Sequence, residues 1–356
     1  MILRTLLACL VGSVVVSAPL PSLPEVSGTV SIPAQEWPFH RGPRTVAVHL
    51  RYPGGTMAGV LPSTGLMLSL HNWGGTGFTG TADPEMLARE YDVVAIGVDY
   101  LQSGPEAGLQ GPPYDFGFLQ ALDCLRALHF AIDGFAHRGV AVNSRRLYVT
   151  GGSGGGNVAL MANKLAPRTF ACVIDLCGMK RLTDDIAFDQ PGGSPLNARY
   201  RRDPANPHHL SIDRQELHFL GHPGHLRLMR QWGATARMIS VHGTEDTTCP
   251  FFDAAEFAAN VRAAGLELET WFLTSEMLDG TIFTSTGHSL GDRSLIVRRV
   301  AGDSLKPGGI HSRIRTGPTD FDRREILRYP TTHGAYVIDY RAGVPLGRFE
   351  ASTTAK

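Results

Sequence analysis

The chain has 356 residues, of which 43% are apolar, enough for one large hydrophobic core or for a main domain with a modest appendage. Its 33 basic residues balance its 33 acidic ones, so no broad surface field favours nucleic acid or an anionic membrane as a partner. The composition therefore indicates a globular chain and argues against a nucleic-acid-binding protein.

Residues 1–18 have the pattern of a secretory signal peptide. Arg4 supplies a short positive region, an apolar stretch of 11 residues runs from Leu6 to Val16, and the small residues Ser17 and Ala18 follow. The stretch is too short for a membrane span, and a retained membrane anchor is the alternative. No later run of 18 apolar residues occurs. We therefore expect an exported protein, periplasmic or secreted, with no membrane span in its mature part.

Short β-branched runs alternate with longer amphipathic stretches over residues 28–302. Such alternation predicts an α/β protein whose mostly parallel sheet has helices on both faces. In a sheet of this kind the functional loops leave the carboxyl ends of the strands. We predict strands over 45–51, 65–71, 92–98, 146–150, 171–176, 238–242 and 266–273, and helices over 116–132, 157–165 and 252–264.

Two segments depart from this alternation. Residues 179–232 hold several prolines, histidines and arginines between two predicted strands and are too long for a simple connection, so we expect an inserted cap or a set of pocket-lining loops. Residues 303–356 contain Gly and Pro punctuation and one short predicted strand, 335–340. We interpret them as a C-terminal extension packed on the main domain, which spans 28–302.

The strongest functional signal is the run Gly151-Gly152-Ser153-Gly154-Gly155 between a predicted strand and a predicted helix. A serine hydroxyl is a weak nucleophile and must be exposed beside a base, where backbone amides can receive an oxyanion. A sharp strand–turn–helix elbow provides this position, and it requires small residues two before and two after the serine. A glycine-rich turn and a phosphate-binding loop are the alternatives. The run lacks the Lys-Ser/Thr ending of a P-loop, however, and gives no clean GxGxxG.

Three motifs together resemble those of the α/β-hydrolase superfamily, and most closely its prolyl-oligopeptidase-like and dienelactone-hydrolase-like branch. The first is the elbow with its extra glycine, Gly156. The second is the run from His242 to Pro250, which matches the HGxxDxxVP loop of the branch with Cys249 in place of valine. The third is Gly287-His288-Ser289, after the last predicted core strand. The order Ser, Asp, His is also that of the superfamily. The resemblance covers residues 45–299 and implies an α/β-hydrolase fold.

The resemblance implies a catalytic triad. Ser153 would be the nucleophile, His288 the general base, and Asp246 the acid that fixes the imidazole tautomer and stabilises the imidazolium. Glu245 is next to Asp246 but does not occupy the aspartate position of the HGxxDxxVP motif. Asp175 lies inside an apolar predicted strand, where we expect a buried structural group.

Two backbone N–H groups should form the oxyanion hole. One belongs to Gly154, directly after the nucleophile. Relatives carry His-Gly-x after a core strand, and by analogy the second group belongs to Trp73, which here follows Asn72 in place of the glycine. The Trp73 indole is expected to wall the acyl pocket or to serve as plain packing. Asn72 and Tyr100 are further candidates for the substrate pocket.

The predicted cap is rich in histidine, which makes a metal site an alternative to consider. Pro223 and Gly224 should break any helix that would align these histidines, and no acidic ligand is interleaved, so we expect no metal. Three arginines of the cap are expected to form a solvated basic loop, with binding of an anionic substrate group as the alternative. These residues are His208, His209, His218, His222 and His225, and Arg199, Arg201 and Arg202.

Four cysteines remain once Cys9 is removed with the signal peptide. Export permits disulfides, but no CxxC pair indicates zinc or redox chemistry, and Cys172 and Cys177 are too far apart along one extended run to bridge each other. We expect buried free thiols at Cys124, Cys172, Cys177 and Cys249.

The predicted reaction is a two-step acyl transfer to water that needs neither a metal nor an organic cofactor. The same machinery cleaves esters and peptides. The typical peptidase of the branch carries a large gating domain ahead of its catalytic part, whereas about fifty residues precede the core here, so the resemblance favours a small carboxylic ester over a short peptide. A non-catalytic binding domain of the same fold and a metallohydrolase centred on the cap histidines are rival hypotheses.

Overall fold

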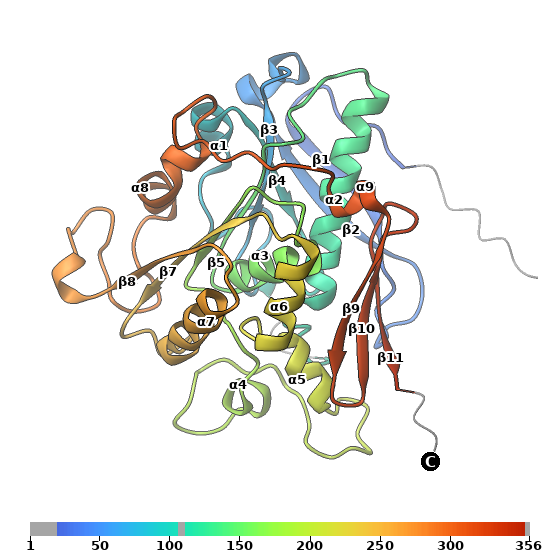
Figure 1. Cartoon of the computed structure of the whole chain (residues 1–356), viewed down its shortest axis with the longest axis vertical. Helices are drawn as coiled ribbons and strands as arrows, with labels where there is room; N and C mark the ends of the chain where they lie inside the picture. Colours follow the sequence, from blue (N-terminus) through green and yellow to red (C-terminus); the bar gives the residue numbers. More distant parts are fainter. Residues whose placement is uncertain (1–19, 106–110, 353–356) are drawn as a thin grey trace, which may run out of the picture.

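The centre of the protein is an eight-stranded sheet, seen in a computed structural model that describes residues 20–105 and 111–352 (Figure 1). Its strand order is β1-β2-β4-β3-β5-β6-β7-β8. β1 pairs antiparallel with β2, and β2 with β4, whereas all later neighbours are parallel. The strands are β1 (Gly28–Ala34), β2 (Arg44–Arg51), β3 (Gly65–Leu70), β4 (Val93–Val98), β5 (Leu147–Gly152), β6 (Cys172–Leu176), β7 (Arg237–Gly243) and β8 (Leu268–Leu273).

Helices cover both faces of this sheet (Figure 1). In β3, Leu66 and Leu68 pack into one apolar cluster and Met67 into another, because successive side chains of a strand point to opposite faces. A strand that is buried on both faces is apolar almost throughout, which explains the continuous runs in the sequence. The first cluster includes α2 (Phe118–His137), α3 (Gly154–Leu165) and α7 (Phe251–Ala263), and the second includes α1 (Pro84–Tyr91) and α8 (Arg293–Leu305).

The predicted α/β architecture is confirmed, and each predicted strand and helix occurs with its ends shifted by a few residues. Among the elements that form or cover the eight-stranded sheet, the sequence analysis missed β1, α1 and α8. β1 is an edge strand with one buried side chain, so it has no long apolar run. Both missed helices begin with good signals, because Asp83 and Asp292 act as N-caps that accept backbone N–H groups of the first turn.

Three helices lie in the segment 179–232: α4 (Asp184–Phe188), α5 (Ile212–His218) and α6 (Pro223–Trp232). As expected, no single helix carries the cap histidines past Pro223, because α5 ends at His218 and α6 begins at Pro223. Pro223 is the first residue of α6, where a missing N–H costs nothing, and the His222 side chain caps the helix by accepting the His225 N–H.

Helix α5 is fastened on two sides. The Lys164 ammonium group of α3 donates to the carbonyl oxygens of Leu217 (2.6 Å) and Phe219 (3.1 Å). On the other side, the Asp213 carboxylate accepts the Thr331 hydroxyl (2.8 Å) and the His333 N–H (2.6 Å). The helix is thereby held between the main sheet layer and the C-terminal residues.

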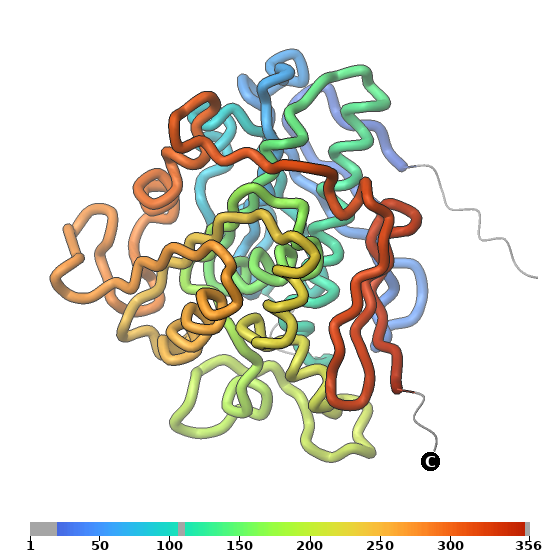
Figure 2. Tube along the Cα trace, in the orientation of Figure 1, coloured from blue at the N-terminus to red at the C-terminus, as the bar shows by residue number. Residues whose placement is uncertain are grey.

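The C-terminal residues form a separate antiparallel sheet in the order β11-β10-β9. Its buried side chains, such as Tyr329 and Ile338, belong to the same apolar cluster as Leu66 of β3. Figure 2 shows this sheet in red beside blue N-terminal segments, and Gln35 and Gly347 exchange two hydrogen bonds across that boundary (2.6 and 2.8 Å). The strands are β9 (Ile326–Thr331), β10 (Gly334–Asp339) and β11 (Leu346–Ala351), preceded by α9 (Asp320–Arg323).

The remaining elements are short 3₁₀ turns, η1 (Pro53–Gly55), η2 (Met57–Gly59) and η4 (Ser275–Met277). Within residues 20–105 and 111–352, no helix has the length and apolar character to cross a membrane. The signal peptide predicted for residues 1–18, including Cys9, lies outside the described residues, and the division into domains stays a prediction. The expected free thiols are confirmed: Cys124, Cys172, Cys177 and Cys249 are buried and unpaired.

Candidate active site

The three residues predicted to form the triad lie at one edge of the main sheet. Ser153 follows β5, Asp246 follows β7, and His288 lies on the connection between β8 and α8. The strands β5, β7 and β8 are parallel, with β6 between β5 and β7, so their carboxyl ends lie at the same edge of the sheet.

The side chains meet at hydrogen-bonding distance. His288 Nε2 lies 2.9 Å from the Ser153 hydroxyl oxygen, and His288 Nδ1 lies 2.8 Å from Asp246 Oδ2. With its proton on Nδ1, the imidazole donates to the carboxylate and accepts from the serine hydroxyl. This is the arrangement in which a histidine can take a proton from an attacking serine.

Ser153 sits at a strained turn between β5 and α3. Its φ of 55° and ψ of −117° are unfavourable for a residue with a side chain, and such strain concentrates at functional sites. The glycines around it are required by space, because a Cβ on Gly151 would lie 2.2 Å from the Gly155 carbonyl oxygen. The Ser153 N–H donates to the Leu176 carbonyl (2.8 Å), which ties the turn to β6.

Asp246 is held as a buried, fully hydrogen-bonded carboxylate. Its side chain is 0% exposed, and Oδ1 accepts the N–H groups of Thr248 and Cys249, both at 2.9 Å. Burial alone would raise its pKa, but the hydrogen bonds from His288 and Cys249 hold the pKa below its usual value. The neighbouring Glu245 instead accepts the Thr286 hydroxyl at 2.5 Å, so it does not take the place of Asp246.

The Asp246 carboxylate also sets the protonation of His288, whose side chain is 26% exposed. Burial lowers the pKa of His288, but the hydrogen bond to Asp246 and the neighbouring groups of Cys177 and Cys249 together outweigh this effect and raise the pKa above 6.5. The carboxylate therefore stabilises the imidazolium that forms when the serine loses its proton.

The two predicted oxyanion-hole groups lie next to each other. A Cβ on Gly154 would lie 2.6 Å from the Trp73 backbone nitrogen, so the two backbones are in contact beside Ser153. Within the described residues, neither N–H donates a hydrogen bond. Both donors are thus available to a developing oxyanion.

The Trp73 indole packs face to face on Tyr114, with ring centroids 3.7 Å apart and planes 8° from parallel. Tyr114 belongs to no motif, and the sequence analysis did not predict this pairing. Both rings lie in an apolar cluster with Met179, Leu182 and Cys249. The cluster joins the start of segment 179–232 to the site and provides an apolar wall.

The other two pocket candidates, Tyr100 and Asn72, lie outside this apolar cluster. Tyr100 is 1% exposed, its ring stacks on His71, and its hydroxyl donates to the His71 carbonyl at 2.5 Å. It supports the end of β3 rather than facing a substrate. The Asn72 side chain packs into its own loop, because a Cβ on Gly80 would lie 2.8 Å from Asn72 Cγ.

Two of the charged residues singled out in the sequence have ion-pair partners. Asp175 is buried and paired with Lys180 (2.7 Å), as expected for a structural group. Arg202 pairs with Asp184 (3.0 Å). Among the described residues, the donors that approach each other closely enough for a metal are not the cap histidines but Cys177, Asp246 and His288, within 4.8 Å.

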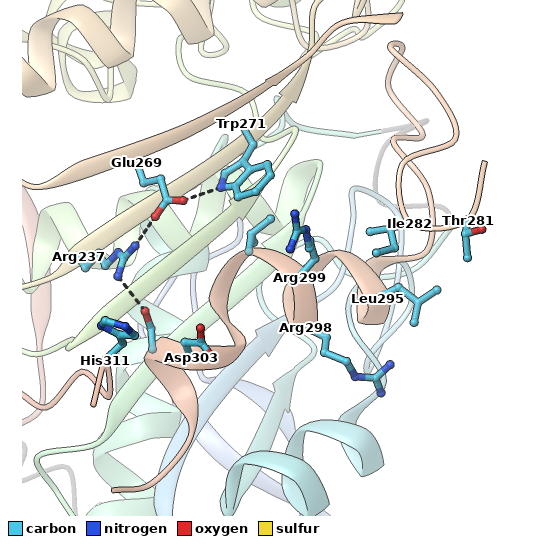
Figure 3. Close-up of a pocket in the computed structure, with 12 residues that line it drawn as sticks. Arg237, Glu269, Trp271, Thr281, Ile282, Leu295, Arg298, Arg299, Asp303 and His311 are labelled. Atoms are coloured by element: carbon cyan, nitrogen blue, oxygen red, sulfur yellow. Dashed lines mark hydrogen bonds and ion pairs between the residues drawn. The ribbon is translucent and has the colours of Figure 1, made fainter. Parts of the chain in front are cut away.

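A hollow of about 790 Å³ lies between β8 and α8 (Figure 3). Its polar groups bind one another, since Glu269 accepts from the Trp271 indole (2.8 Å) and pairs with Arg237. None of the three triad residues lines it. The chemistry therefore lies elsewhere, at the carboxyl edge of the sheet.

Comparisons with known proteins agree with this family and fold. The sequence model described as the prolyl oligopeptidase family matches residues 122–301. The search of the curated proteins found no match. The fold is similar to that of an acylaminoacyl peptidase from Pyrococcus horikoshii (TM-score 0.54, 14% identity, covering 80% of this chain and 43% of that one). It is also similar to a putative dipeptidyl aminopeptidase IV from Bacteroides ovatus (TM-score 0.50, 13% identity, 77% and 35%). The chain thus spans less than half the length of these proteins, and at this identity the likeness shows the α/β-hydrolase fold alone.

Proposed function

Because the chain belongs to the prolyl oligopeptidase family of serine hydrolases, we propose that it cleaves carboxylic esters through an acyl-enzyme on Ser153. A short peptide is the second candidate substrate, favoured by the family match. The observation that supports the proposal most directly is the hydrogen-bonded series from Ser153 through His288 to Asp246, at 2.9 and 2.8 Å.

The reaction would proceed in two steps. The Ser153 oxygen attacks the substrate carbonyl carbon while His288 Nε2 takes the hydroxyl proton, and the oxyanion is received by the N–H groups of Gly154 and Trp73. The imidazolium then protonates the leaving alcohol or amine as the C–O or C–N bond breaks. In the second step His288 takes a proton from water as the water oxygen attacks the acyl carbon. The imidazolium then returns this proton to the Ser153 oxygen as its bond to the acyl carbon breaks and the acid leaves.

An apolar acyl group suits the site best. The Trp73 ring, fixed by its stack on Tyr114, offers a flat apolar wall next to the proposed oxyanion hole. A peptide would in addition bring charged termini. Two arginines of the segment 179–232 already have partners, since Arg202 pairs with Asp184 and Arg201 donates to the Tyr200 carbonyl. The apolar wall next to the proposed oxyanion hole is therefore the observation that supports the ester over the peptide.

Labelling with a fluorophosphonate probe tests the nucleophile. We expect the wild-type protein to be labelled and Ser153→Ala not to be. Ser63→Ala is a matched control, because Ser63 is an exposed serine just before β3, at the opposite edge of the sheet, and it should be labelled like the wild type. If the wild type and Ser153→Ala react alike, a non-catalytic binding domain would explain the fold better.

Substrate class needs a separate comparison. We expect kcat/KM for short p-nitrophenyl esters to exceed kcat/KM for aminoacyl-p-nitroanilides, with both activities absent from Ser153→Ala. A much larger kcat/KM for the anilides would make the protein a peptidase.

We also propose that the protein is exported, on the basis of residues 1–18. Cell fractionation followed by N-terminal sequencing should find a processed form that starts near Pro19. A cytoplasmic protein that retains Met1 would contradict this proposal.

A further inference from the structure

We propose that Arg293 and Cys177 form a positioning pair that fixes His288 in its catalytic place. This inference rests on the proposed function of the triad. The two residues and the His288 carbonyl form a closed set of contacts: Arg293 Nη2 donates to the His288 carbonyl oxygen (3.3 Å) and to Cys177 Sγ (3.2 Å), and Cys177 Sγ donates to the same carbonyl (3.1 Å). Neither residue belongs to a motif of the sequence.

Cys177 lies between the nucleophile and the acid. It follows β6, which pairs with the strand of Ser153 on one side and the strand of Asp246 on the other. Its sulfur belongs to the group of donor atoms, with those of Asp246 and His288, that lie within 4.8 Å of one another. The thiol is therefore next to the triad without being part of it.

The backbone of Cys177 is strained. Its φ of 48° lies in the left-handed region, which a residue with a side chain seldom adopts, and its N–H is fixed to the Val241 carbonyl at 2.7 Å. Strain of this kind persists only where the surroundings impose it, and it clusters at functional sites. Here the conformation directs the sulfur to the His288 loop.

Arg293 occupies an unfavourable position for a cation. It is the first residue of α8, where the helix dipole disfavours positive charge, and within the described residues it has no carboxylate partner. Its Nη1 is buried without a hydrogen-bond partner. The guanidinium group also packs beneath the elbow, because a Cβ on Gly152 would lie 3.4 Å from Arg293 Nε. The unfavourable helix dipole and the unbonded Nη1 both destabilise the folded protein. A role of the guanidinium group at the His288 carbonyl explains why an arginine is nevertheless present.

The pair acts on the backbone of His288, whereas Asp246 acts on its ring. A hydrogen bond to Nδ1 sets the ring tautomer and tilt but leaves the position of the Cα free to follow the loop. The hydrogen bonds of Arg293 and Cys177 to the His288 carbonyl remove that freedom. Catalytic groups need to be held within about 0.5 Å, and a displacement of about 1 Å can cost about 100-fold in rate.

The experiment compares Arg293→Ala, Arg293→Lys and Cys177→Ala with Arg298→Ala, a control on the same helix whose side chain pairs with Glu90. For a p-nitrophenyl ester we expect Arg293→Ala to lower kcat and the rate of fluorophosphonate labelling by about 10- to 100-fold, with KM within about threefold. Arg293→Lys should recover part of this loss, because one donor can still reach the carbonyl. Arg298→Ala should match the wild type.

Two further measurements separate positioning from general stability. Added methylguanidine should restore activity to Arg293→Ala but not to Ser153→Ala. The proton NMR signal of the His288–Asp246 hydrogen bond, far downfield, should broaden or disappear in Arg293→Ala while the melting temperature shows the protein folded. If Arg293→Ala does not fold, Cys177→Ala gives the same test with a smaller change, and it should lower kcat without changing KM.

The two proposals fail in different ways. A wild-type protein that is not labelled at Ser153 would contradict the proposed function. A labelled, active wild type whose Arg293→Ala and Cys177→Ala variants keep wild-type kcat and an unchanged NMR signal would overturn the positioning pair alone. A parallel loss of kcat and melting temperature without methylguanidine rescue would also overturn it.

Discussion

Replacement of Asp246 by asparagine removes one charge from the site while keeping its shape. The wild-type carboxylate is 0% exposed and lies 2.8 Å from the imidazole nitrogen. Charge centres about 4 Å apart in surroundings with an effective dielectric constant of about 20 interact by about 4 kcal/mol. If that interaction is made with the imidazolium of the transition state, its loss lowers kcat by about 1000-fold. An asparagine amide can also donate to Nδ1, which would favour the wrong tautomer and add to the loss.

The assay is kcat/KM for a p-nitrophenyl ester as a function of pH. Because Asp246 raises the pKa of His288, wild-type activity should increase with pH through a value above 6.5, as the imidazole becomes neutral. In Asp246→Asn the rise of activity with pH should occur at lower pH. Glu245→Gln is the matched control, since that carboxylate binds Thr286, and its loss should stay below about tenfold. Two results would refute this reasoning. In one, Asp246→Asn keeps more than about a tenth of the wild-type kcat. In the other, the pH at which its activity rises moves upward.

Two other changes test the packing around the site. Gly154→Ala would place a Cβ 2.6 Å from the Trp73 nitrogen, so both oxyanion donors should move. We expect kcat to fall by about 100-fold. Unchanged steady-state kinetics would contradict the placement of the oxyanion hole. Burial lowers the pKa of Lys164 to about 7, whereas the unfolded chain holds this proton up to about 10.5. The wild-type free energy of unfolding should therefore rise by about 1.4 kcal/mol per pH unit more steeply than that of Lys164→Met between about pH 7 and 10, as measured by denaturant titration, and equal slopes would show that Lys164 keeps its proton.

The triad residues were the most predictable part of the site. The turn around Ser153 leaves no room for a Cβ at Gly151, so the glycines that permit it are visible in the sequence. Asp246 and His288 were found because each lies in a short motif after a core strand. Trp73 was reached only by analogy, since an N–H group has no signature of its own.

The rest of the site depends on contacts between segments that are far apart in the chain. The stack of Tyr114 on Trp73 and the contact of Arg293 with Cys177 join side chains from different loops, and no local periodicity encodes them. Tyr100 was a candidate for the substrate pocket, and its hydroxyl holds the His71 carbonyl. Partner choice of this kind follows from tertiary packing rather than from residue type.

Prediction of the secondary structure was limited in the same way. Central strands were predictable because burial on both faces makes them continuously apolar. β9 was missed because Pro330 interrupts its pattern, and the strand tolerates proline since it is an edge of the sheet β11-β10-β9. Pro223 separates α5 from α6, as expected, but the sequence analysis did not predict that it also begins α6, which depends on the capping contact of His222.

The fastening of α5 has a consequence for the order in which the protein unfolds. A helix tied through Lys164 to α3 and through Asp213 to the C-terminal sheet cannot detach without breaking the hydrogen bonds that both side chains make. This helix should thus not open locally while the layers on its two sides stay folded. Its amides should exchange with solvent as slowly as those of α3.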